Sequence, residues 1–173
     1  DPDPRSGDGA GGLPDARPAI DALTDQSPEV RAVAAHSLGD IATTGNAATR
    51  RRSVDLVVQF LVESLRDSDG TVATAAAESL GRLGADAAPS IVPLLAAPDT
   101  VAYHAANALR AMGAPVLPLL IRAAGEASTA RWATVVLGEI GDGSARDIVR
   151  ARSEDPDPDI RYVAQAALAK LGG

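Results

Sequence analysis

The sequence predicts an all-α fold, a right-handed α-solenoid of about five helical hairpins, and three observations predict it. First, one pattern of thirteen residues occurs five times along the 173-residue chain. Second, the apolar positions of this pattern fall at 1, 5, 9 and 12, the spacing of one stripe on an α-helix. Third, a shorter apolar segment lies next to each copy. Repeats of this kind bury their apolar faces only by stacking on one another.

The five copies align without gaps. They read VRAVAAHSLGDIA at 30–42, VATAAAESLGRLG at 72–84, VAYHAANALRAMG at 101–113, TARWATVVLGEIG at 129–141 and IRYVAQAALAKLG at 160–172. The fifth position is always Ala and the ninth is always Leu. The alanine allows a neighbouring helix to approach closely, and the leucine fills the space between helices.

The chain divides into two parts by composition. Residues 1–16 are rich in Gly, Pro and Asp and contain one large apolar residue, Leu13. Such a segment buries too little apolar surface to offset the entropy of ordering it, so we expect a disordered or linker segment there. We expect residues 17–173 to form the repeat solenoid.

Each copy of the pattern predicts a helix, which we term an A helix. We expect the A helices near 28–42, 70–84, 99–113, 127–141 and 158–172. Residues whose side chains cap helices precede each copy, namely Ser27, Asp69, Asp99, Ser128 and Asp157. Glycine ends four of the five copies, as expected of a helix that stops in a left-handed turn.

The segments between the copies predict shorter B helices. We expect them near 17–24, 52–66, 90–97, 115–125 and 144–153. Pro18, Pro93 and Pro118 stand near the starts of three of them, where a missing amide proton costs little. The distance between the first two copies is about a dozen residues longer than the others, and we place the excess in the connection TTGNAATRRR and a longer B helix.

Composition excludes several classes of protein. The chain has no cysteine, so disulfides and thiolate sites are absent. A formal net charge of −7 disfavours nucleic acid and anionic membranes as general partners. We see neither a membrane-spanning stretch nor a secretory signal, and we expect a cytoplasmic protein. The first residue is Asp, and the array begins with a B helix and ends with an A helix, which suggests a fragment of a longer repeat protein.

The pattern VR-x-x-AA-x-x-LG-x-[IL]-G, followed by V-P-x-L-L, resembles HEAT repeats. It is most similar to the short HEAT-like repeats of the phycobilisome-lyase type. The match is full for Val30–Arg31, Ala34–Ala35 and Leu38–Gly39, while Ala73, Ala102 and Ala130 replace the arginine in the middle copies. The resemblance implies a HEAT/armadillo-like superhelix with A helices on the convex face and B helices on the concave face. The family includes scaffolds, bilin-attachment proteins and a di-iron hydroxylase, so the resemblance does not by itself identify a function.

No catalytic, cofactor or metal site is predicted. The hydroxylase branch of the family needs His-Glu pairs, whereas His36 and His104 are followed by Ser37 and Ala105, which excludes that chemistry. We interpret His104 as a half-buried packing residue. The acidic runs at 67–70 and 155–159 lack the ligand spacing of a calcium loop and are expected to cap helices.

Two sets of residues are candidates for binding a protein partner. The first is basic: Arg50, Arg51 and Arg52 in the long connection, with Arg122, Arg146 and Arg150 on later B helices. The second is aromatic: Tyr103, Trp132 and Tyr162 on A helices. Solvated pairing of the arginines with nearby Asp and packing of the aromatics between A helices are the alternative interpretations.

We therefore predict a non-catalytic scaffold or adaptor for protein–protein interaction. Its concave groove is expected to present exposed residues of the B helices: Asp21, Arg52, Asp55, Gln59, Glu63, Arg122, Arg146 and Arg150. Four of these are arginines, which favours an acidic or amphipathic partner segment. The alternative function is a bilin lyase or chaperone for a tetrapyrrole-binding protein, to which Tyr103, His104 and Trp132 could contribute a pocket.

Overall fold

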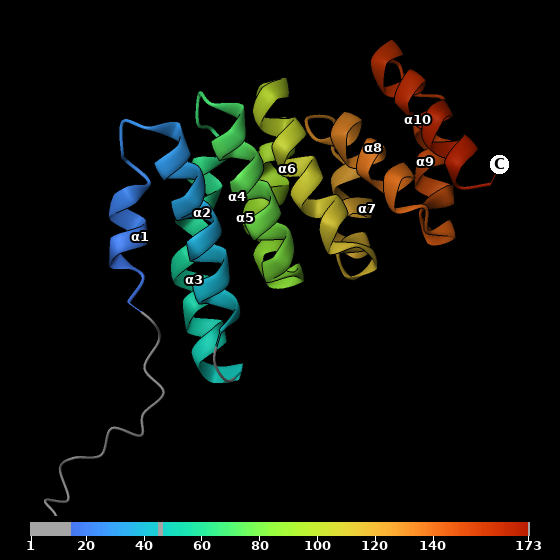
Figure 1. Cartoon of the computed structure of the whole chain (residues 1–173). Helices are drawn as coiled ribbons and strands as arrows, with labels where there is room; N and C mark the ends of the chain where they lie inside the picture. Colours follow the sequence, from blue (N-terminus) through green and yellow to red (C-terminus); the bar gives the residue numbers. More distant parts are fainter. Residues whose placement is uncertain (1–14, 45–46, 173) are drawn as a thin grey trace, which may run out of the picture.

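Two layers of helices, stacked along one direction, form the protein (Figure 1). The structure is a computed structural model that describes residues 15–44 and 47–172, with the side chains of residues 47–53 outside that description. No strand occurs among the described residues, so the predicted all-α solenoid is confirmed. The predicted linker lies almost wholly outside them; Asp15 is described, and its carboxylate accepts hydrogen bonds from Arg17.

The A layer contains the long helices that carry the repeated pattern. They are α2 (Pro28–Thr43), α4 (Gly70–Leu83), α6 (Asp99–Met112), α8 (Ala130–Ile140) and α10 (Pro158–Lys170). The B layer contains α1 (Arg17–Ala22), α3 (Ala47–Ser64), α5 (Ala88–Ile91), α7 (Leu117–Gly125) and α9 (Arg146–Arg152). In Figure 1 the chain runs from α1 at one end of the array to α10 at the other.

Several B helices differ from the predicted single helices. Short 3₁₀ segments precede or follow the α-helical turns at Ala85–Ala87, Val92–Ala96, Ala114–Val116 and Gly143–Ala145. Pro93 lies at the start of the second of these segments, where its missing amide proton prevents an α-helical hydrogen bond. Helix α3 begins at Ala47 instead of near Arg52. Arg50, Arg51 and Arg52 all lie within α3, so the placement of this cluster in the long connection was wrong.

The predicted core stripe is confirmed at the fifth and ninth positions, except that Leu168 is half-buried; at the first and twelfth positions burial varies, and Val30 is exposed. Leu38, Leu80, Leu109 and Leu137, at the ninth position of four copies, are each 0% exposed. The five alanines at the fifth position are all buried as well. Because each leucine fills the space between the A and B layers, the core runs continuously along the array rather than forming separate clusters.

Three of the five predicted helix caps are confirmed. Ser27, Asp69 and Asp157 accept hydrogen bonds from backbone amides in the first turns of α2, α4 and α10. The other two predictions were wrong. Ser128 does not cap α8, because the helix begins after Thr129, whose hydroxyl donates to the Ala123 carbonyl and leaves the helix without a side-chain cap. Asp99 lies inside the first turn of α6, and its carboxylate binds side chains of α8 instead.

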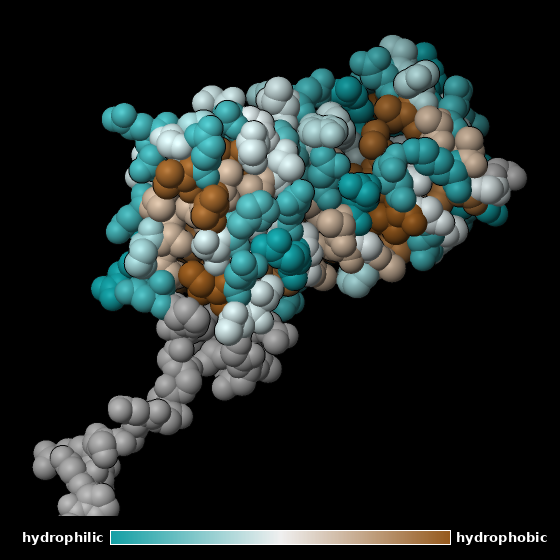
Figure 2. Space-filling model, viewed as in Figure 1, coloured by the Kyte–Doolittle hydropathy of each residue, from teal (hydrophilic) through white to brown (hydrophobic). Residues whose placement is uncertain are grey.

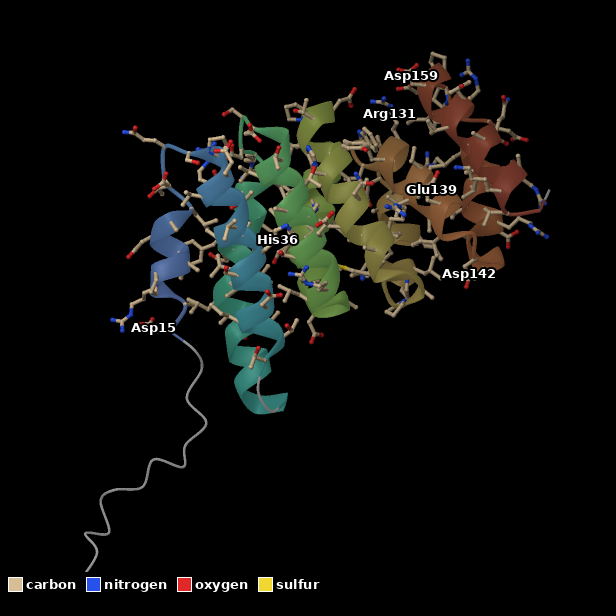
Figure 3. The ribbon with its side chains drawn as sticks, in the orientation of Figure 1. Asp15, His36, Arg131, Glu139, Asp142 and Asp159 are labelled. Atoms are coloured by element: carbon tan, nitrogen blue, oxygen red, sulfur yellow. The ribbon has the colours of Figure 1, made fainter. Side chains whose placement is uncertain are left out.

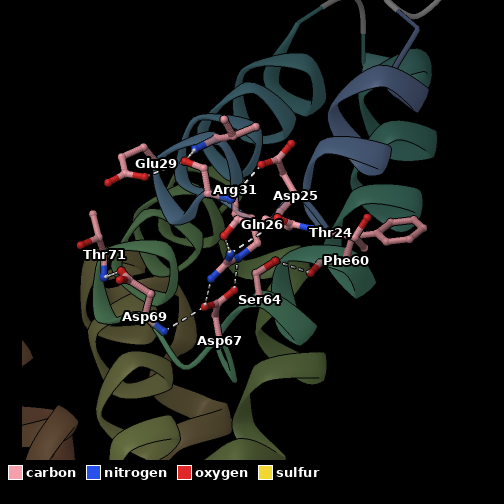
Figure 4. Close-up of polar contacts among 12 residues, drawn as sticks. Thr24, Asp25, Gln26, Glu29, Arg31, Phe60, Ser64, Asp67, Asp69 and Thr71 are labelled. Atoms are coloured by element: carbon pink, nitrogen blue, oxygen red, sulfur yellow. Dashed lines mark hydrogen bonds and ion pairs between the residues drawn. The ribbon is translucent and has the colours of Figure 1, made fainter.

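An ion pair links the first turn of α2 to the turn before α4 (Figure 4). The guanidinium of Arg31 donates from Nε and one terminal nitrogen to the two carboxylate oxygens of Asp67, both at 2.8 Å. It also donates to the carbonyls of Asp25 and Gln26. The hydrogen bonds from Arg31 hold the pKa of Asp67 below its ordinary value. These bonds fix the start of α2 relative to α4.

Glycines set the close spacing of most A helices. A Cβ added at Gly39 would lie 2.7 Å from Cβ of Ser79, and one at Gly138 would lie 2.6 Å from Cβ of Ala167. These glycines occupy the tenth position of their copies, and the residues they meet occupy the eighth position of the next copy. Gly81, also at the tenth position, meets Cβ of Ala111, at the eleventh position of the next copy, at 2.8 Å. The tenth position is therefore where one A helix touches the next.

Candidate partner-binding surface

The third copy of the repeat lacks the glycine through which neighbouring A helices make close contact. Arg110 occupies its tenth position, where three other copies have glycine. Across from it on α8, the eighth position is Val136, which is larger than the Ser or Ala found at the corresponding positions of α4, α6 and α10. Helices α6 and α8 contact each other less than any other neighbouring pair in the A layer. A large residue thus replaces the glycine, and the two helices separate at the surface.

A depression of about 320 Å³ fills this junction. Ala106 and Val136, both buried, form its apolar floor. Its walls and rim carry larger side chains: Tyr103, Asn107 and Arg110 from α6, with Trp132, Val135 and Glu139 from α8. Tyr103 is 53% exposed. An aromatic wall over an apolar floor, with polar groups at the rim, is the composition of a protein-binding site.

The aromatic wall is held in place by polar contacts. The ring of Tyr103 meets the ring of Trp132 edge-on, with centroids 6.3 Å apart. Trp132 donates from Nε1 to Asp99 at 3.2 Å, and Arg131 donates to the same oxygen at 2.7 Å while its guanidinium lies 5.3 Å from the centre of the Trp132 ring. The hydrogen bonds from Trp132 and Arg131 lower the pKa of Asp99, so it is ionised at neutral pH. These contacts fix the orientation of the Trp132 indole before any partner binds.

A second depression, of about 250 Å³, lies on the other side of α6. Thr74, Ala77 and Glu78 of α4 face Tyr103, His104 and Asn107 of α6 across it, with Arg110 and Ala111 completing its lining. Tyr103 contacts His104 edge-on at 5.3 Å. Burial lowers the pKa of His104, which keeps the imidazole neutral at pH 7. The predicted half-buried packing position of His104 agrees with the structure.

The rim of the α6–α8 depression has one charge without a partner in the described part of the chain. Glu139 binds Lys170, and this hydrogen bond lowers the pKa of Glu139 (Figure 3 labels Glu139 and Arg131 on α8). Asp99 binds Arg131. The exposed guanidinium of Arg110 forms no hydrogen bond or ion pair with a described residue. The surface therefore offers an exposed cation beside an aromatic wall, and the charge of this cation also helps to lower the pKa of Glu139.

The structure brings only some of the predicted binding residues together. Tyr103 and Trp132 come together, whereas Tyr162 lies on α10, 74% exposed and outside both depressions. Of the described basic residues in the predicted set, Arg146 is engaged within the chain. Arg146 donates to the carbonyls of Leu171 and Gly172, which gives it a structural role at the end of α10.

The remaining arginines of the predicted track differ from one another. Arg150 lies 4.0 Å from Asp147 with 63% of its side chain exposed, and Arg122 is exposed on α7. The side chains of Arg50, Arg51 and Arg52 lie outside the described residues. Sequence reasoning missed Asn107, Arg110 and Glu139, although the replacement of glycine by Arg110 in the aligned copies was a visible signal.

The described residues contain no group of three or more His, Cys, Asp or Glu placed to hold a metal ion. Within the same part of the chain, no single helix has both the length and the apolar character to cross a membrane. One pair, Asp99–Met112 with Ala114–Gly125, meets the length and composition criteria only when taken together, and it is bent by 114°.

The fold and this surface define the class of protein: an α-solenoid of stacked helical hairpins. The family model for HEAT repeats matches residues 16–110 and 58–135, and the chain therefore belongs to the HEAT-repeat family. No curated protein matches the chain closely enough to count as a relative.

Solved structures with similar folds share little sequence with the chain. An engineered protein is 22% identical, with a TM-score of 0.45, and the match covers 90% of this chain and 78% of that one. The complex of CpcE and CpcF of phycocyanin lyase from Nostoc sp. PCC7120 is also 22% identical, with a TM-score of 0.49 and coverage of 94% and 67%. A designed armadillo repeat protein in complex with the peptide (KR)4 is 17% identical, with a TM-score of 0.43 and coverage of 90% and 81%.

Proposed function

We propose that this protein is a non-catalytic scaffold or adaptor that binds a segment of a partner protein on the surface of its A helices. The observation that carries the proposal is the depression between α6 and α8, with its preoriented Trp132, exposed Tyr103 and unpaired Arg110. HEAT-repeat solenoids typically bind proteins, and their extended surfaces suit linear segments. We propose that the A helices, rather than the B helices of our sequence-based prediction, provide this surface.

The spacing of the helices supports the choice of face. Neighbouring A helices contact one another extensively through their glycine and alanine positions, whereas neighbouring B helices contact one another little. Apart from α3, the B helices are also shorter than the A helices, so the A helices form the more continuous face of the array.

The chemistry of the depression specifies the partner segment. An apolar anchor would pack between Tyr103 and Trp132 over the floor of Ala106 and Val136. A carboxylate on the same segment would pair with Arg110. An amphipathic segment with an acidic residue fits both features, and the charged contact would act chiefly on the association rate and its salt dependence.

Selection from a displayed random-peptide library tests this proposal. Peptides selected on the wild-type chain are measured by calorimetry against Trp132→Ala and Tyr103→Ala. Loss of an anchoring aromatic costs about 2 kcal/mol or more, so we expect affinity to fall by about thirtyfold. Tyr162→Ala is the matched control, because Tyr162 is an exposed tyrosine at the third position of the fifth copy, as Tyr103 is in the third copy. If the peptides bound Arg122→Glu or Arg150→Glu more weakly than the wild type, and Trp132→Ala and Tyr103→Ala equally well, the binding site would lie on the B helices.

Bilin binding is the second candidate, because Tyr103, His104 and Trp132 do lie together. The two depressions are shallow and measure about 250 and 320 Å³, at or below the lower end of small-molecule pockets of about 300–1,000 Å³. We therefore expect no change in the visible absorbance of a free linear tetrapyrrole on adding the protein. A saturable spectral shift that is lost in Tyr103→Ala would favour this second function.

A further inference from the structure

One side of helix α6 bounds both depressions of the candidate surface. Tyr103, Asn107 and Arg110 line the depression between α6 and α8 and also the one between α4 and α6. They occupy the third, seventh and tenth positions of the third copy, so they form a single row along the helix. Tyr103 and Arg110 are exposed, whereas Asn107 is half-buried. This row is therefore a ridge with a depression on either side.

The depression between α4 and α6 carries two charges of opposite sign. Glu78 of α4 and Arg110 of α6 both line it, yet no hydrogen bond or ion pair joins these two described residues. The side chain of Glu78 is 60% exposed, and its Oε2 lies 3.8 Å from Nε2 of His36, which attracts it only when the imidazole is protonated. Burial lowers the pKa of His104, which also lines the depression, so its neutral imidazole does not repel a cation. Both charges are therefore accessible to a binding partner.

The linings of the two depressions differ. Trp132, Val135 and Val136 line the depression between α6 and α8, which suits an apolar anchor. The aliphatic lining of the other depression consists of Ala77 and Ala111. In Figure 2, hydrophilic residues (teal) are interspersed with less polar ones (white and tan) over the middle of the array, where α4 and α6 lie in the same view. The depression between α4 and α6 therefore suits a charged side chain rather than a second apolar anchor.

The distance between the two depressions limits which partner segment reaches both. They lie on opposite sides of α6, so their separation is close to the distance between two packed helices, roughly 8–10 Å. Residues three apart in a polyproline II segment lie on the same side and about 9 Å apart, because this helix has three residues per turn. An α-helix is about 10–12 Å across with its side chains, so it would rest on the exposed ring of Tyr103 instead of entering both depressions.

We propose that the partner segment crosses α6 as an extended, polyproline II-like chain, with an apolar residue in the depression between α6 and α8 and a lysine or arginine, three positions away, paired with Glu78. The carboxylate that pairs with Arg110 lies on a residue between these two. The inference rests on the proposed function and adds to it a conformation, a spacing and a second charge. A segment that is apolar and acidic but has no basic residue leaves Glu78 unpaired.

Charge reversal at Glu78 tests this pairing, with separate selections from the displayed random-peptide library on the wild-type chain and on Glu78→Lys. We expect wild-type peptides to share a basic residue three positions from their apolar anchor, and Glu78→Lys peptides to carry an acidic residue there. The wild-type peptides should bind Glu78→Lys about fivefold more weakly at low salt, because exposed ion pairs contribute little, and the difference should shrink at high salt. Asp147→Lys is the matched control, because it makes the same change of charge at an exposed position of α9 outside both depressions.

The outcomes separate this inference from the proposed function. If no peptide is selected, or if the selected peptides bind Trp132→Ala as tightly as the wild type, the proposed function fails and this inference fails with it. If Trp132→Ala weakens binding but the peptides lack the basic residue or bind Glu78→Lys as tightly as the wild type, this inference alone is overturned. A basic residue seven positions from the anchor, the spacing of one face of an α-helix, or an equal loss of affinity in Asp147→Lys would also overturn it.

Discussion

Helix α8 lies between two neighbours that it meets in different ways. Toward α10, Gly138 allows contact so close that a single added methyl group would lie 2.6 Å from Cβ and 2.8 Å from Cα of Ala167. Toward α6, Arg110 stands at the position equivalent to that glycine, and a depression lined by Tyr103 and Trp132 opens instead. The same repeat therefore builds a closed junction or an open one through the size of one residue. Beneath both junctions the core has a fully buried leucine at the ninth position of each copy, Leu109 in α6 and Leu137 in α8.

The largest expected effect tests whether the two junctions share that core. Leu109 and Leu137 occupy the ninth positions of α6 and α8 and are each 0% exposed. Replacing either leucine with Ala leaves a cavity, and we expect a loss of about 2–5 kcal/mol in the free energy of unfolding for each. Urea unfolding followed by circular dichroism measures both losses. If Leu109→Ala were neutral while Leu137→Ala was costly, the open junction would extend into the core.

A smaller effect separates the closed junction from the open one. Gly138→Ala forces the backbone of α10 to move, and overpacking of this kind costs about 1–3 kcal/mol, against a gain of about 1 kcal/mol in helix propensity. Gly125→Ala is the matched control, because no atom lies within 4 Å of its added Cβ. We expect Gly138→Ala to melt at a lower temperature than Gly125→Ala. Arg110 is exposed, so we expect the free energy of unfolding of Arg110→Ala to stay within about 0.5 kcal/mol of that of the wild type. Equal melting temperatures for the two glycine variants would contradict the close contact.

The smallest expected effect is on the pH dependence of stability. Hydrogen bonds from Arg31 lower the pKa of Asp67 from its ordinary value of 3.8 in the folded protein. The stabilisation is therefore fully present above about pH 4 and is lost as pH falls through the lowered pKa. We expect Asp67→Asn to melt below wild type at pH 7 and the difference to shrink toward pH 2. A difference that is independent of pH would show that the charge of Asp67 does not contribute.

The sequence predicted the fold well because its signal is repeated. Position-by-position alignment of the five copies identified the buried Leu109 and Ala105, and the capping aspartates Asp69 and Asp157, from local patterns alone. The failures came where a side chain interacts beyond its own turn. Asp99 has the sequence context of a cap, yet Arg131 and Trp132, more than thirty residues later, bind its carboxylate.

The candidate site was only partly predictable for the same reason. Tyr103 and Trp132 were selected as exposed aromatics, but their contact depends on the spacing of α6 and α8, which a single helix does not reveal. The basic track was predicted by assigning arginines of separate B helices to one face. Arg146 instead binds the carbonyls of Leu171 and Gly172, which directly follow α10, so the contact depends on where that helix ends.

The central claim is that a partner segment binds in the depression between α6 and α8, and Trp132 tests it most directly. Trp132 is the only tryptophan in the chain and forms one wall of the depression, so its fluorescence reports on that site alone. We predict that a library-selected peptide without tryptophan shifts or quenches this emission saturably, with the same Kd that calorimetry gives. Binding detected by calorimetry with no change in Trp132 emission would contradict the account.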